Sequence, residues 1–474
     1  MLRFRVLSSA LVFPALVLPT LVDLAFVLRA ADSGPVETLA SLAPALAFLW
    51  LLGGFVVAYH ITEHHTPDSP QRPIFSVVPL AVASVAAIAA WMLVVPLFDI
   101  ITGAAGISRI GQNYAQLRLT GLPILAALVP LRLQFDGHGS WSPVLWGALA
   151  LNALNIGLNA ALLDGHIPGV APSVSGLAIA TVVSYAAGLA VAIGVAIRRN
   201  IKFFELHWPS TKSITDDLWK RTRSASLRVT CWSIPLLSIV GLLSLAIATD
   251  RAALATAVEW ATTSAPALEF APSLTNSLDA GPHRLLIADW TAELARSRPP
   301  LYLAASTLVV AASSLVIAFA VGVADAATGT RSNGDGGNEI SGATSARDIA
   351  TALAVVISVP ALAIFLAPHK LLSPLTTDSH LVATAAPALR IVFAWLPLVG
   401  IATVVITSSD NTAKRRLLGF ITLGSAASLS TAYLLSLVLE VGFMGIWWGF
   451  TLTSAAWMTA MTIDYFRRPD PRDD

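Results

Sequence analysis

One carboxylate lies deep inside one of the most apolar stretches of the chain. Asp23 stands in the run PTLVDLAFV, and we place no other acidic residue so far inside a predicted membrane span. An ionised carboxylate at that depth is costly unless it faces a polar cavity, a cation or a partner, so it is a candidate carrier of a proton or another cation. The alternative is that Asp23 reaches toward the outer membrane surface, since Arg29 follows six residues later.

Three amide side chains follow on one predicted helix, in the sequence LNALNIGLNAAL. Asn155 and Asn159 share a helix face at this spacing, and Asn152 lies close to that face. One asparagine in an apolar helix needs only an interhelical hydrogen bond, whereas three on one face indicate a hydrated cavity or a cation site. Thr181 on the next predicted helix can add a hydroxyl group, although the small residues around it also favour close helix packing.

Two prolines and two arginines are further notable residues of the predicted spans. Pro14 and Pro19 precede Asp23 and predict a kinked helix, because proline removes a backbone hydrogen bond. Arg118 and Arg390 are the paired cations within predicted spans, apart from Arg228 near the start of 226–248. They can brace a carboxylate, reach the membrane surface, or line a cavity that attracts anionic substrates. Bracing is the interpretation we favour.

Motifs of soluble enzymes are absent from the sequence, which contains no Walker motif, no G-x-G-x-x-G before a helix, no G-x-S-x-G and no H-E-x-x-H. A small cluster has a spacing that can hold zinc: His60, Glu63, His64 and His65. Prolines follow it at once, and we interpret the cluster as a solvated loop. We therefore expect no catalytic residue, no resident metal and no cofactor other than a coupling ion.

The composition explains why these few polar groups are informative. The chain has 474 residues, of which 55% are hydrophobic and only 12% charged, and its mean hydropathy is +0.73. Globular domains carry about a quarter charged residues, so this composition excludes a soluble fold. The net charge of +1 gives no basic surface for nucleic acid, and the single cysteine, Cys231, excludes an internal disulfide. A polytopic integral membrane protein remains.

Twelve apolar segments are long enough to be read as membrane-spanning helices. The first half gives 6–28, 37–60, 74–97, 114–131, 141–163 and 173–197, and the second half gives 226–248, 301–324, 350–367, 384–408, 417–437 and 442–466. A weaker candidate at 252–275 carries Glu259 and Glu269, which are costly in lipid. We exclude it.

The placement of basic residues sets the orientation. With a cytoplasmic N-terminus, the inside segments hold 20 Lys and Arg residues and the outside segments hold 7. Counting 252–275 as a span moves Lys414, Arg415 and Arg416 to the outside. Both termini are therefore predicted to be cytoplasmic, in a multi-pass protein of the plasma membrane whose first apolar segment is an uncleaved span.

The spans divide into two halves of six. We predict an N-terminal six-helix bundle at 1–197, a charged cytoplasmic linker at 198–225 and a C-terminal six-helix bundle at 226–474. The second bundle carries an extracytoplasmic insertion at 249–300 and a Gly/Ser-rich cytoplasmic loop at 325–349.

Two pairs of segments indicate that the halves are repeats. LRLTGLPI at 117–124 is similar to LRIVFAWLPL at 389–398, and VSGLAIATVVS at 174–184 is similar to FMGIWWGFTLT at 443–453. The predicted fold class is thus an all-α polytopic membrane protein of two six-helix bundles, related by a pseudo-two-fold axis along the membrane normal.

The stretch from Tyr114 to Ser184 also resembles a known family. It reads Y-x-x-L-R-L-x-G-L-P, then L-N-x-x-L-N-I-G-L-N, then G-L-A-I-A-T-V-V-S. These patterns are similar to the fourth to sixth helices of multidrug and toxic compound extrusion (MATE) transporters, within the flippase superfamily that includes lipid exporters. The first span with Asp23 and the segment VGFMGIWWGF fit the same family, whereas 226–350 resembles it weakly.

The resemblance implies two bundles that alternate access and export amphiphilic, often cationic compounds in exchange for H⁺ or Na⁺. In the DinF-like branch it assigns cation coupling to Asp23, Asn155 and Thr181. Two positions depart from the family pattern, because Asn159 stands where a second acid is common and Pro19 where a tyrosine is common. The acidic residues of the NorM-like branch have no counterpart in 226–248 or 384–408.

Three functions are compatible with the sequence. The leading hypothesis is a cation-coupled exporter of small amphiphilic molecules, embedded in the bilayer as a monomer, with Asp23, Asn155, Asn159 and Thr181 in one pocket. The second is a flippase for a lipid-linked sugar, which would depend on Arg118 and Arg390. The third is a membrane-embedded transferase that uses polar residues of the 249–300 region: Glu259, Glu269, His283 and Asp289.

Overall fold

The structure is a computed structural model of the whole chain. It describes residues 2–30, 35–63, 77–102, 110–137, 142–163, 173–199, 301–323, 346–408, 411–439, 441 and 443–467. The linker beyond Arg199, the span 226–248, the insertion 249–300 with the excluded segment 252–275, and the loop 325–349 up to residue 345 lie outside the described residues.

Every described element is helical. The first half contains α1 (Leu2–Ala30), α2 (Pro35–Glu63), α3 (Val77–Thr102), α4 (Ile110–Leu119), α5 (Leu122–Gly137), α6 (Ser142–Leu163) and α7 (Val174–Arg198). The second half contains the helix Leu301–Val323, α10 (Ala346–Leu366), α11 (Pro368–Leu372), α12 (Ser379–Ser408), α13 (Asn411–Tyr433), the π-helical turn η2 (Leu434–Val438) and α14 (Phe443–Phe466). We call these two sets the N-lobe and the C-lobe.

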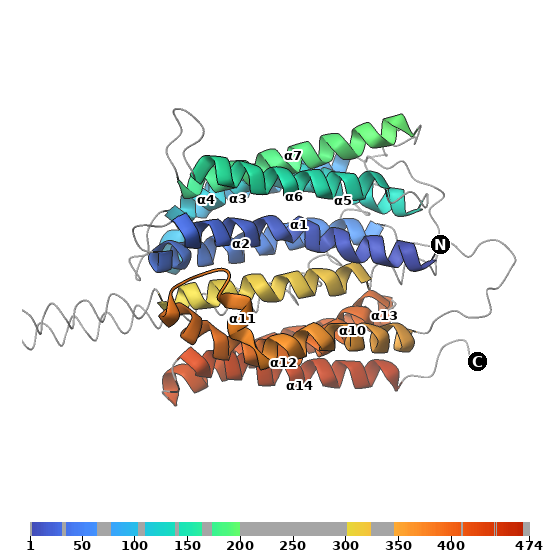
Figure 1. Cartoon of the computed structure of the whole chain (residues 1–474). Helices are drawn as coiled ribbons and strands as arrows, with labels where there is room; N and C mark the ends of the chain where they lie inside the picture. Colours follow the sequence, from blue (N-terminus) through green and yellow to red (C-terminus); the bar gives the residue numbers. More distant parts are fainter. Residues whose placement is uncertain are drawn as a thin grey trace, which may run out of the picture.

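The two lobes lie side by side with their helices roughly parallel (Figure 1). α1 and α2 face the helix Leu301–Val323 at the junction, while α6 and α7 lie on the far side of the N-lobe and α14 on the far side of the C-lobe. α1 begins and α14 ends at the same end of the bundle. This arrangement agrees with a predicted topology in which both termini lie on one side of the membrane.

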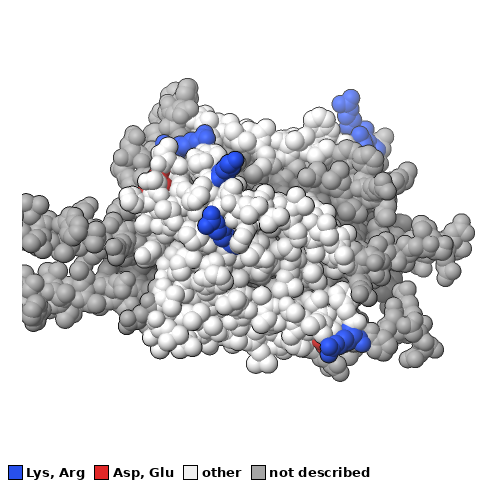
Figure 2. Space-filling view, turned by 60° about the horizontal axis from the view of Figure 1, so that its bottom comes forward, with Lys and Arg blue, Asp and Glu red and all other residues white. Residues whose placement is uncertain are grey.

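The outer surface of the bundle is apolar. Large side chains project outward from several helices, including Met92 (67% exposed), Val359 (69%) and Leu423 (74%). On the face shown in Figure 2, uncharged residues cover most of the described surface, and Lys and Arg occur at few places. Four described helices are long and apolar enough to cross a bilayer by themselves: Ser142–Leu162, Val174–Arg198, Leu301–Val323 and Ser379–Ile406. Such a surface suits hydrocarbon rather than water.

Glycines set the closest helix contacts. A Cβ atom on Gly147 would lie 2.8 Å from the carbonyl oxygen of Gly188, and one on Gly188 would lie 2.9 Å from that of Gly147, so α6 and α7 touch through their backbones. In the C-lobe a Cβ atom on Gly449 would lie 2.6 Å from the backbone of Ala432 on α13. Small residues at these positions let apolar helices pack by van der Waals contact, which is the main association force in lipid.

Three local predictions differ from the structure. The predicted span 114–131 is broken at Thr120 and Gly121 into α4 and α5, because Pro123 cannot donate a backbone hydrogen bond to Leu119. The predicted span 417–437 ends in the π-helical turn η2 rather than continuing as an α-helix. The predicted solvated loop around His60 is wrong for part of its length, since α2 continues through His60 to Glu63.

The lobes contact each other near the ends where α2 and the helix Leu301–Val323 begin. The Thr307 hydroxyl donates to the Leu39 carbonyl at 3.3 Å, and Arg29 Nη2 donates to the Pro374 carbonyl at 3.5 Å. One continuous cluster of buried apolar side chains includes Leu39 of α2 and Leu303 of the facing helix. The lobes therefore meet through a packed apolar surface at the end that the predicted topology places outside the cell, and Val17 of α1 also packs against Ala318 and Val321 farther along the helix Leu301–Val323.

Candidate cation-binding site

Asp23 is the centre of a polar cluster inside the N-lobe. Its side chain is 1% exposed and lies on α1, four residues after Pro19. The Tyr114 hydroxyl on α4 donates to Asp23 Oδ2 at 2.6 Å, and Asn159 Nδ2 on α6 donates to Asp23 Oδ1 at 2.8 Å. The carboxylate thus joins three helices through short hydrogen bonds, which is how a buried charge is stabilised.

Thr181 on α7 completes the cluster. Its hydroxyl lies 2.9 Å from Asp23 Oδ2 and 3.1 Å from Asp23 Oδ1, and also 3.1 Å from the Leu177 carbonyl. Asn155 Nδ2 donates to this hydroxyl oxygen at 3.0 Å. A hydroxyl has one proton to donate, so Thr181 can direct it either to the carboxylate or to the Leu177 carbonyl.

Arg118 on α4 supplies the positive charge. Its Nη1 lies 3.5 Å from Asp23 Oδ2, and its Nη2 donates to the Thr20 hydroxyl at 3.1 Å. The guanidinium also lies over two aromatic rings, 5.7 Å from the centroid of Tyr114 and 5.6 Å from that of Tyr185. Cation–π contacts of this geometry stabilise a desolvated arginine.

Proline chemistry explains the position of Asn152. Pro19 has no N–H group, so the Ala15 carbonyl one turn earlier loses its helical partner. Asn152 Nδ2 donates to that carbonyl at 3.1 Å, and the Tyr185 hydroxyl donates to the next carbonyl, that of Leu16, at 3.0 Å. α6 and α7 thus bind the proline-containing turn of α1 that precedes Asp23.

The structure brings together Asp23, Asn155, Asn159 and Thr181, the four residues to which the sequence analysis assigned coupling. Bracing of a carboxylate, which we favoured for both arginines, is what Arg118 does, whereas Arg390 does not. Arg390 does not share that environment. It lies on an exposed face of α12, where its Nε donates to the Phe365 carbonyl at 3.2 Å. Arg118 is bound to Asp23 and Thr20, whereas Arg390 faces outward, so the two arginines do not line one cavity. The flippase hypothesis depended on such a cavity and is therefore not favoured.

Three further residues of the site were not predicted: Thr20, Tyr114 and Tyr185. Tyr114 and Arg118 are one helical turn apart, as are Thr181 and Tyr185, so their shared faces were visible in the sequence. Thr20 lies only three residues before Asp23. Spacing alone could not show that these faces converge, since that depends on how α4 and α7 are turned against α1.

The side chains around Asp23 are hydrogen-bond donors, which suits an anion rather than a bound metal ion. Among the described residues no group of three His, Cys, Asp or Glu side chains could hold a metal. Two acceptors on α6 are buried without a hydrogen bond, Asn152 Oδ1 and Asn159 Oδ1, and the second belongs to a direct partner of Asp23. An unused buried acceptor next to a carboxyl group is available to a protonated form of that group.

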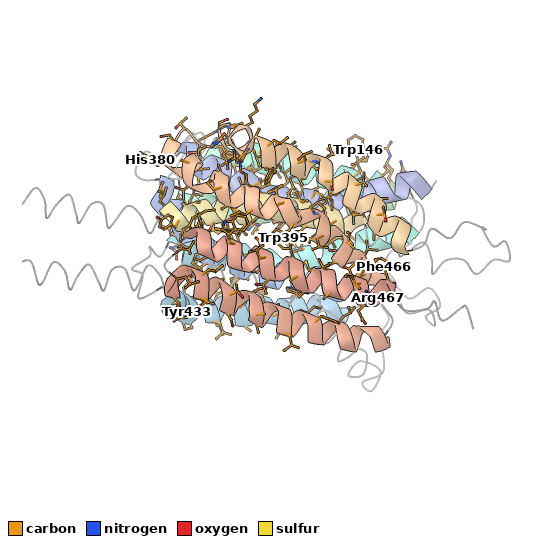
Figure 3. The ribbon with its side chains drawn as sticks, turned by 90° about the horizontal axis from the view of Figure 1, so that it is seen from below. Trp146, His380, Trp395, Tyr433, Phe466 and Arg467 are labelled. Carbon is orange, nitrogen blue, oxygen red and sulfur yellow. The ribbon has the colours of Figure 1, made fainter. Side chains whose placement is uncertain are left out.

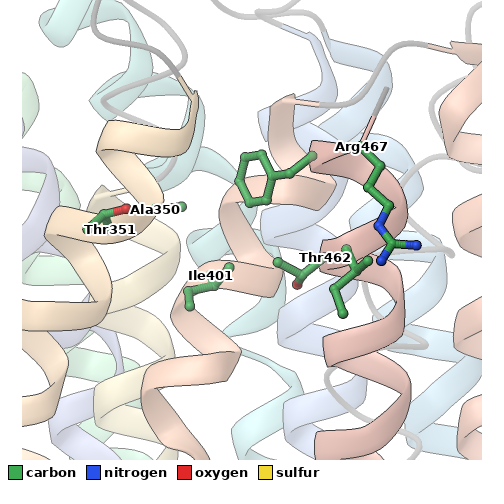
Figure 4. A pocket seen from close by; sticks show the side chains of 7 residues that line it. Ala350, Thr351, Ile401, Thr462 and Arg467 are labelled. Atoms are coloured by element: carbon green, nitrogen blue, oxygen red, sulfur yellow. The ribbon is translucent and has the colours of Figure 1, made fainter. Parts of the chain in front are cut away.

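A surface hollow of about 420 Å³ lies elsewhere, in the C-lobe (Figure 4). It is lined by Thr351, Ile401, Thr462, Phe466 and Arg467 among others, at the ends of α10, α12 and α14. Figure 3 shows Phe466 and Arg467 at the end of the bundle opposite to His380 and Tyr433. No acidic residue lines this hollow, and it has no contact with the cluster around Asp23.

Solved structures of transporters share this fold. The eukaryotic MATE transporter AtDTX14 superposes with a TM-score of 0.62 at 14% identity, covering 99% of this chain and 96% of that one. A MOP superfamily transporter from Pyrococcus furiosus gives 0.59 at 15% identity over 98% and 94% of the two chains. The inward-facing conformation of a multidrug resistance MATE family transporter also gives 0.59, at 15% identity over 96% and 97%. At such identities the likeness establishes the fold alone: the nearly all-helical, two-lobed fold of these structures, in agreement with the predicted fold class.

The sequence itself matches a family model in its second half. Residues 291–434 match the MatE model, although the resemblance noted in the sequence rested mainly on the first half. No curated protein matches the chain significantly. The chain therefore has the fold of the MATE membrane transporters, and residues 291–434 also match the sequence model of that family.

Proposed function

We propose that this protein is a secondary active exporter of the MATE family that exchanges a small amphiphilic or cationic molecule for H⁺ or Na⁺. The observation that carries the proposal is the buried carboxylate of Asp23, bound by side chains of α4, α6 and α7 inside an apolar lobe. A polar cluster this costly to bury is expected to serve function rather than stability. Its place in the N-lobe favours the DinF-like branch.

The cluster has the chemistry needed to hold Asp23 both ionised and protonated. In the ionised form the carboxylate accepts from Tyr114, Asn159 and Thr181. In the protonated form the carboxyl can donate to the Thr181 oxygen while Thr181 donates to the Leu177 carbonyl, or it can donate to the free Asn159 Oδ1 after the amide turns. The same side chains thus offer hydrogen-bond partners to the carboxyl group in both forms.

The charge of the site favours H⁺ over Na⁺. Arg118 Nη1 already lies 3.5 Å from Asp23 Oδ2, so a sodium ion would have to bind next to a guanidinium. Two cations beside one carboxylate repel each other. A proton instead forms a covalent O–H bond and neutralises the carboxylate without needing an additional set of oxygen ligands.

Asp23 can also transmit the change in its charge to the fold. It connects α1 to α4, α6 and α7, and α1 carries Pro14 and Pro19, where a helix bends most easily. Binding of a cation weakens these charge-assisted hydrogen bonds, which lowers the cost of moving α1 away from its neighbours. Such differential binding is what alternating access requires.

The test is dye export by everted membrane vesicles that contain the full chain, driven by an imposed proton or sodium gradient. We expect Asp23→Asn to abolish gradient-driven export of a fluorescent cationic dye. Asp378→Asn is the matched control, since Asp378 Oδ1 in the C-lobe only accepts from the backbone N–H groups of His380 and Leu381 at the start of α12, a role that asparagine also fills. Export that survives Asp23→Asn at the wild-type rate would remove the coupling role.

A further inference from the structure

The guanidinium of Arg118 is held by contacts that do not depend on Asp23. Its Nη2 donates to Thr20 at 3.1 Å, and its two ring contacts with Tyr114 and Tyr185 enclose it. The approach to the carboxylate is longer, at 3.5 Å, and the Arg118 side chain is 7% exposed. Arg118 is therefore a fixed positive charge placed beside Asp23.

Asp23 is the only acidic partner of this cation among the described residues. The other titratable groups that contact the pair are Tyr114 on α4 and Tyr185 on α7. α6 contributes the neutral side chain of Asn159, and no described side chain of α2 adds a charge to the cluster. We call the site closed when α1 is joined to α4, α6 and α7 through Asp23, as in this structure. When Asp23 is neutralised, the closed site retains a buried cation without its anion, and such a charge is strongly destabilising.

We infer that Arg118 is a positioning residue that makes the closed N-lobe stable only while Asp23 is ionised, so that neutralisation of Asp23 by the coupling cation forces α1 to separate from α4. This inference rests on the proposed function and gives it a mechanism. Without a fixed cation, protonation would remove a charge from an apolar interior and would stabilise the closed site. With Arg118 present, protonation creates an unpaired charge, which drives the change of conformation.

The first test measures how export depends on pH in the vesicles described above. In Arg118→Gln the neighbouring positive charge no longer opposes protonation of Asp23. We expect the pH of half-maximal export to rise by at least about one unit, a tenfold change in proton affinity. Arg118→Lys keeps the charge and is expected to stay close to the wild type. Arg390→Gln, an arginine hydrogen-bonded to a backbone carbonyl in the C-lobe, is the matched control and should not move the midpoint.

The second test is a double-variant cycle read by hydrogen exchange of the α1 backbone in the purified full chain. Asp23→Asn leaves Arg118 unpaired in the closed site, and we expect α1 amides to exchange at least about tenfold faster, since an uncompensated buried charge costs several kcal/mol. The double variant Asp23→Asn with Arg118→Gln removes both charges and should regain most of the protection. A merely structural brace gives the opposite order, with the double variant least protected.

The possible results separate this inference from the proposed function. If Arg118→Gln lowers export equally at every pH with an unchanged midpoint, or if the double variant is less protected than either single variant, the inference is overturned. If Arg118→Gln does not fold, the Arg118→Lys variant and the comparison of wild type with Asp23→Asn still test the inference. Unchanged hydrogen-exchange protection of α1 in Asp23→Asn would contradict the inference. Coupled export in Asp23→Asn instead overturns the proposed function itself.

Discussion

Arg118 and Arg390 occupy matching places in two similar sequence segments but very different environments. Arg118 is buried against Asp23, Thr20 and two tyrosine rings, whereas Arg390 is exposed and contacts a backbone carbonyl of α10. The second pair of similar segments differs in the same way. Thr181, which contacts the carboxylate, aligns with Phe450, whose ring packs edge-on against Trp395 at 6.0 Å.

The comparison shows that the two halves share a scaffold but not a chemistry. The glycines that allow α6 to contact α7 have counterparts between α13 and α14. In the described part of the C-lobe, however, the buried polar side chains are Ser and Thr hydroxyls without a buried charge, and Trp447 and Phe393 are among the largest buried side chains. This difference supports our proposal that the N-lobe binds the coupling cation, while the C-lobe supplies the surface against which the N-lobe moves.

The largest expected effect is a loss of export when a hydrogen bond to Asp23 in the N-lobe is removed, compared with the removal of a buried hydrogen bond in the C-lobe. Thr181→Val and Asn159→Leu each remove a donor to the ionised carboxylate, worth about 1.5–3 kcal/mol, so gradient-driven export should fall by about 10- to 100-fold. In the C-lobe, Ser454→Ala removes the 3.2 Å contact between the Ser428 and Ser454 hydroxyls. We expect export by that variant to stay near the wild type, and an equal loss in both lobes would contradict the division of roles.

A second prediction concerns the shared scaffold. Gly188→Ala and Gly449→Ala place a Cβ atom against a facing backbone, and each should lower stability by about 1–3 kcal/mol, measured as a lower unfolding midpoint in detergent. Gly157 and Gly419 have nothing within 4 Å of an added Cβ atom. Substitution of these two by alanine is expected to raise stability by up to about 1 kcal/mol. Equal effects of the two sets would mean that the glycine contacts do not hold the lobes.

A third prediction tests the link between Pro19 and Asn152. Asn152→Ala leaves the Ala15 carbonyl without its side-chain donor and should cost about 1 kcal/mol of stability. Pro19→Ala restores a backbone N–H for that carbonyl, so Asn152→Ala should cost less in that background. Additive effects of the two substitutions in unfolding measurements would show that Asn152 does not act on this carbonyl.

The smallest expected effect is at the surface of the C-lobe. Arg390→Gln removes an exposed hydrogen bond to the Phe365 carbonyl, and we expect stability to change by no more than about 0.5 kcal/mol. Export at a fixed pH should be unchanged as well. A large loss of export in this variant would indicate that the C-lobe arginine does share the role of Arg118.

Much of this arrangement follows from the sequence because hydrocarbon penalises charge so strongly. The scarcity of charge inside the spans singled out Asp23, and helical spacing placed Asn155 and Asn159 on one face. The fold class was predicted from the twelve apolar segments and their repeat. The break between α4 and α5 at Gly121 was missed because a proline inside an apolar run can kink a helix or end it.

The residues that contact the Arg118 guanidinium could not be derived from the sequence in the same way. Arg118 and Arg390 lie in similar sequences, and only the rotation of each helix about its own axis decides which one is buried. The tyrosines of the site resemble ordinary amphipathic residues until α4 and α7 are placed against α1. Helix rotation is set by contacts such as those of Gly147 with Gly188, which involve residues distant in the chain.

The most direct measurement of the central claim follows the coupling cation itself. Purified full-length protein in proteoliposomes, with a pH-sensitive dye inside and a parallel assay with labelled sodium, reports which ion crosses when substrate moves the other way. We expect protons to move with the wild type and with Asp378→Asn, and no coupled proton flux with Asp23→Asn. Substrate-coupled proton or sodium flux in Asp23→Asn equal to that of the wild type would contradict cation binding by the N-lobe.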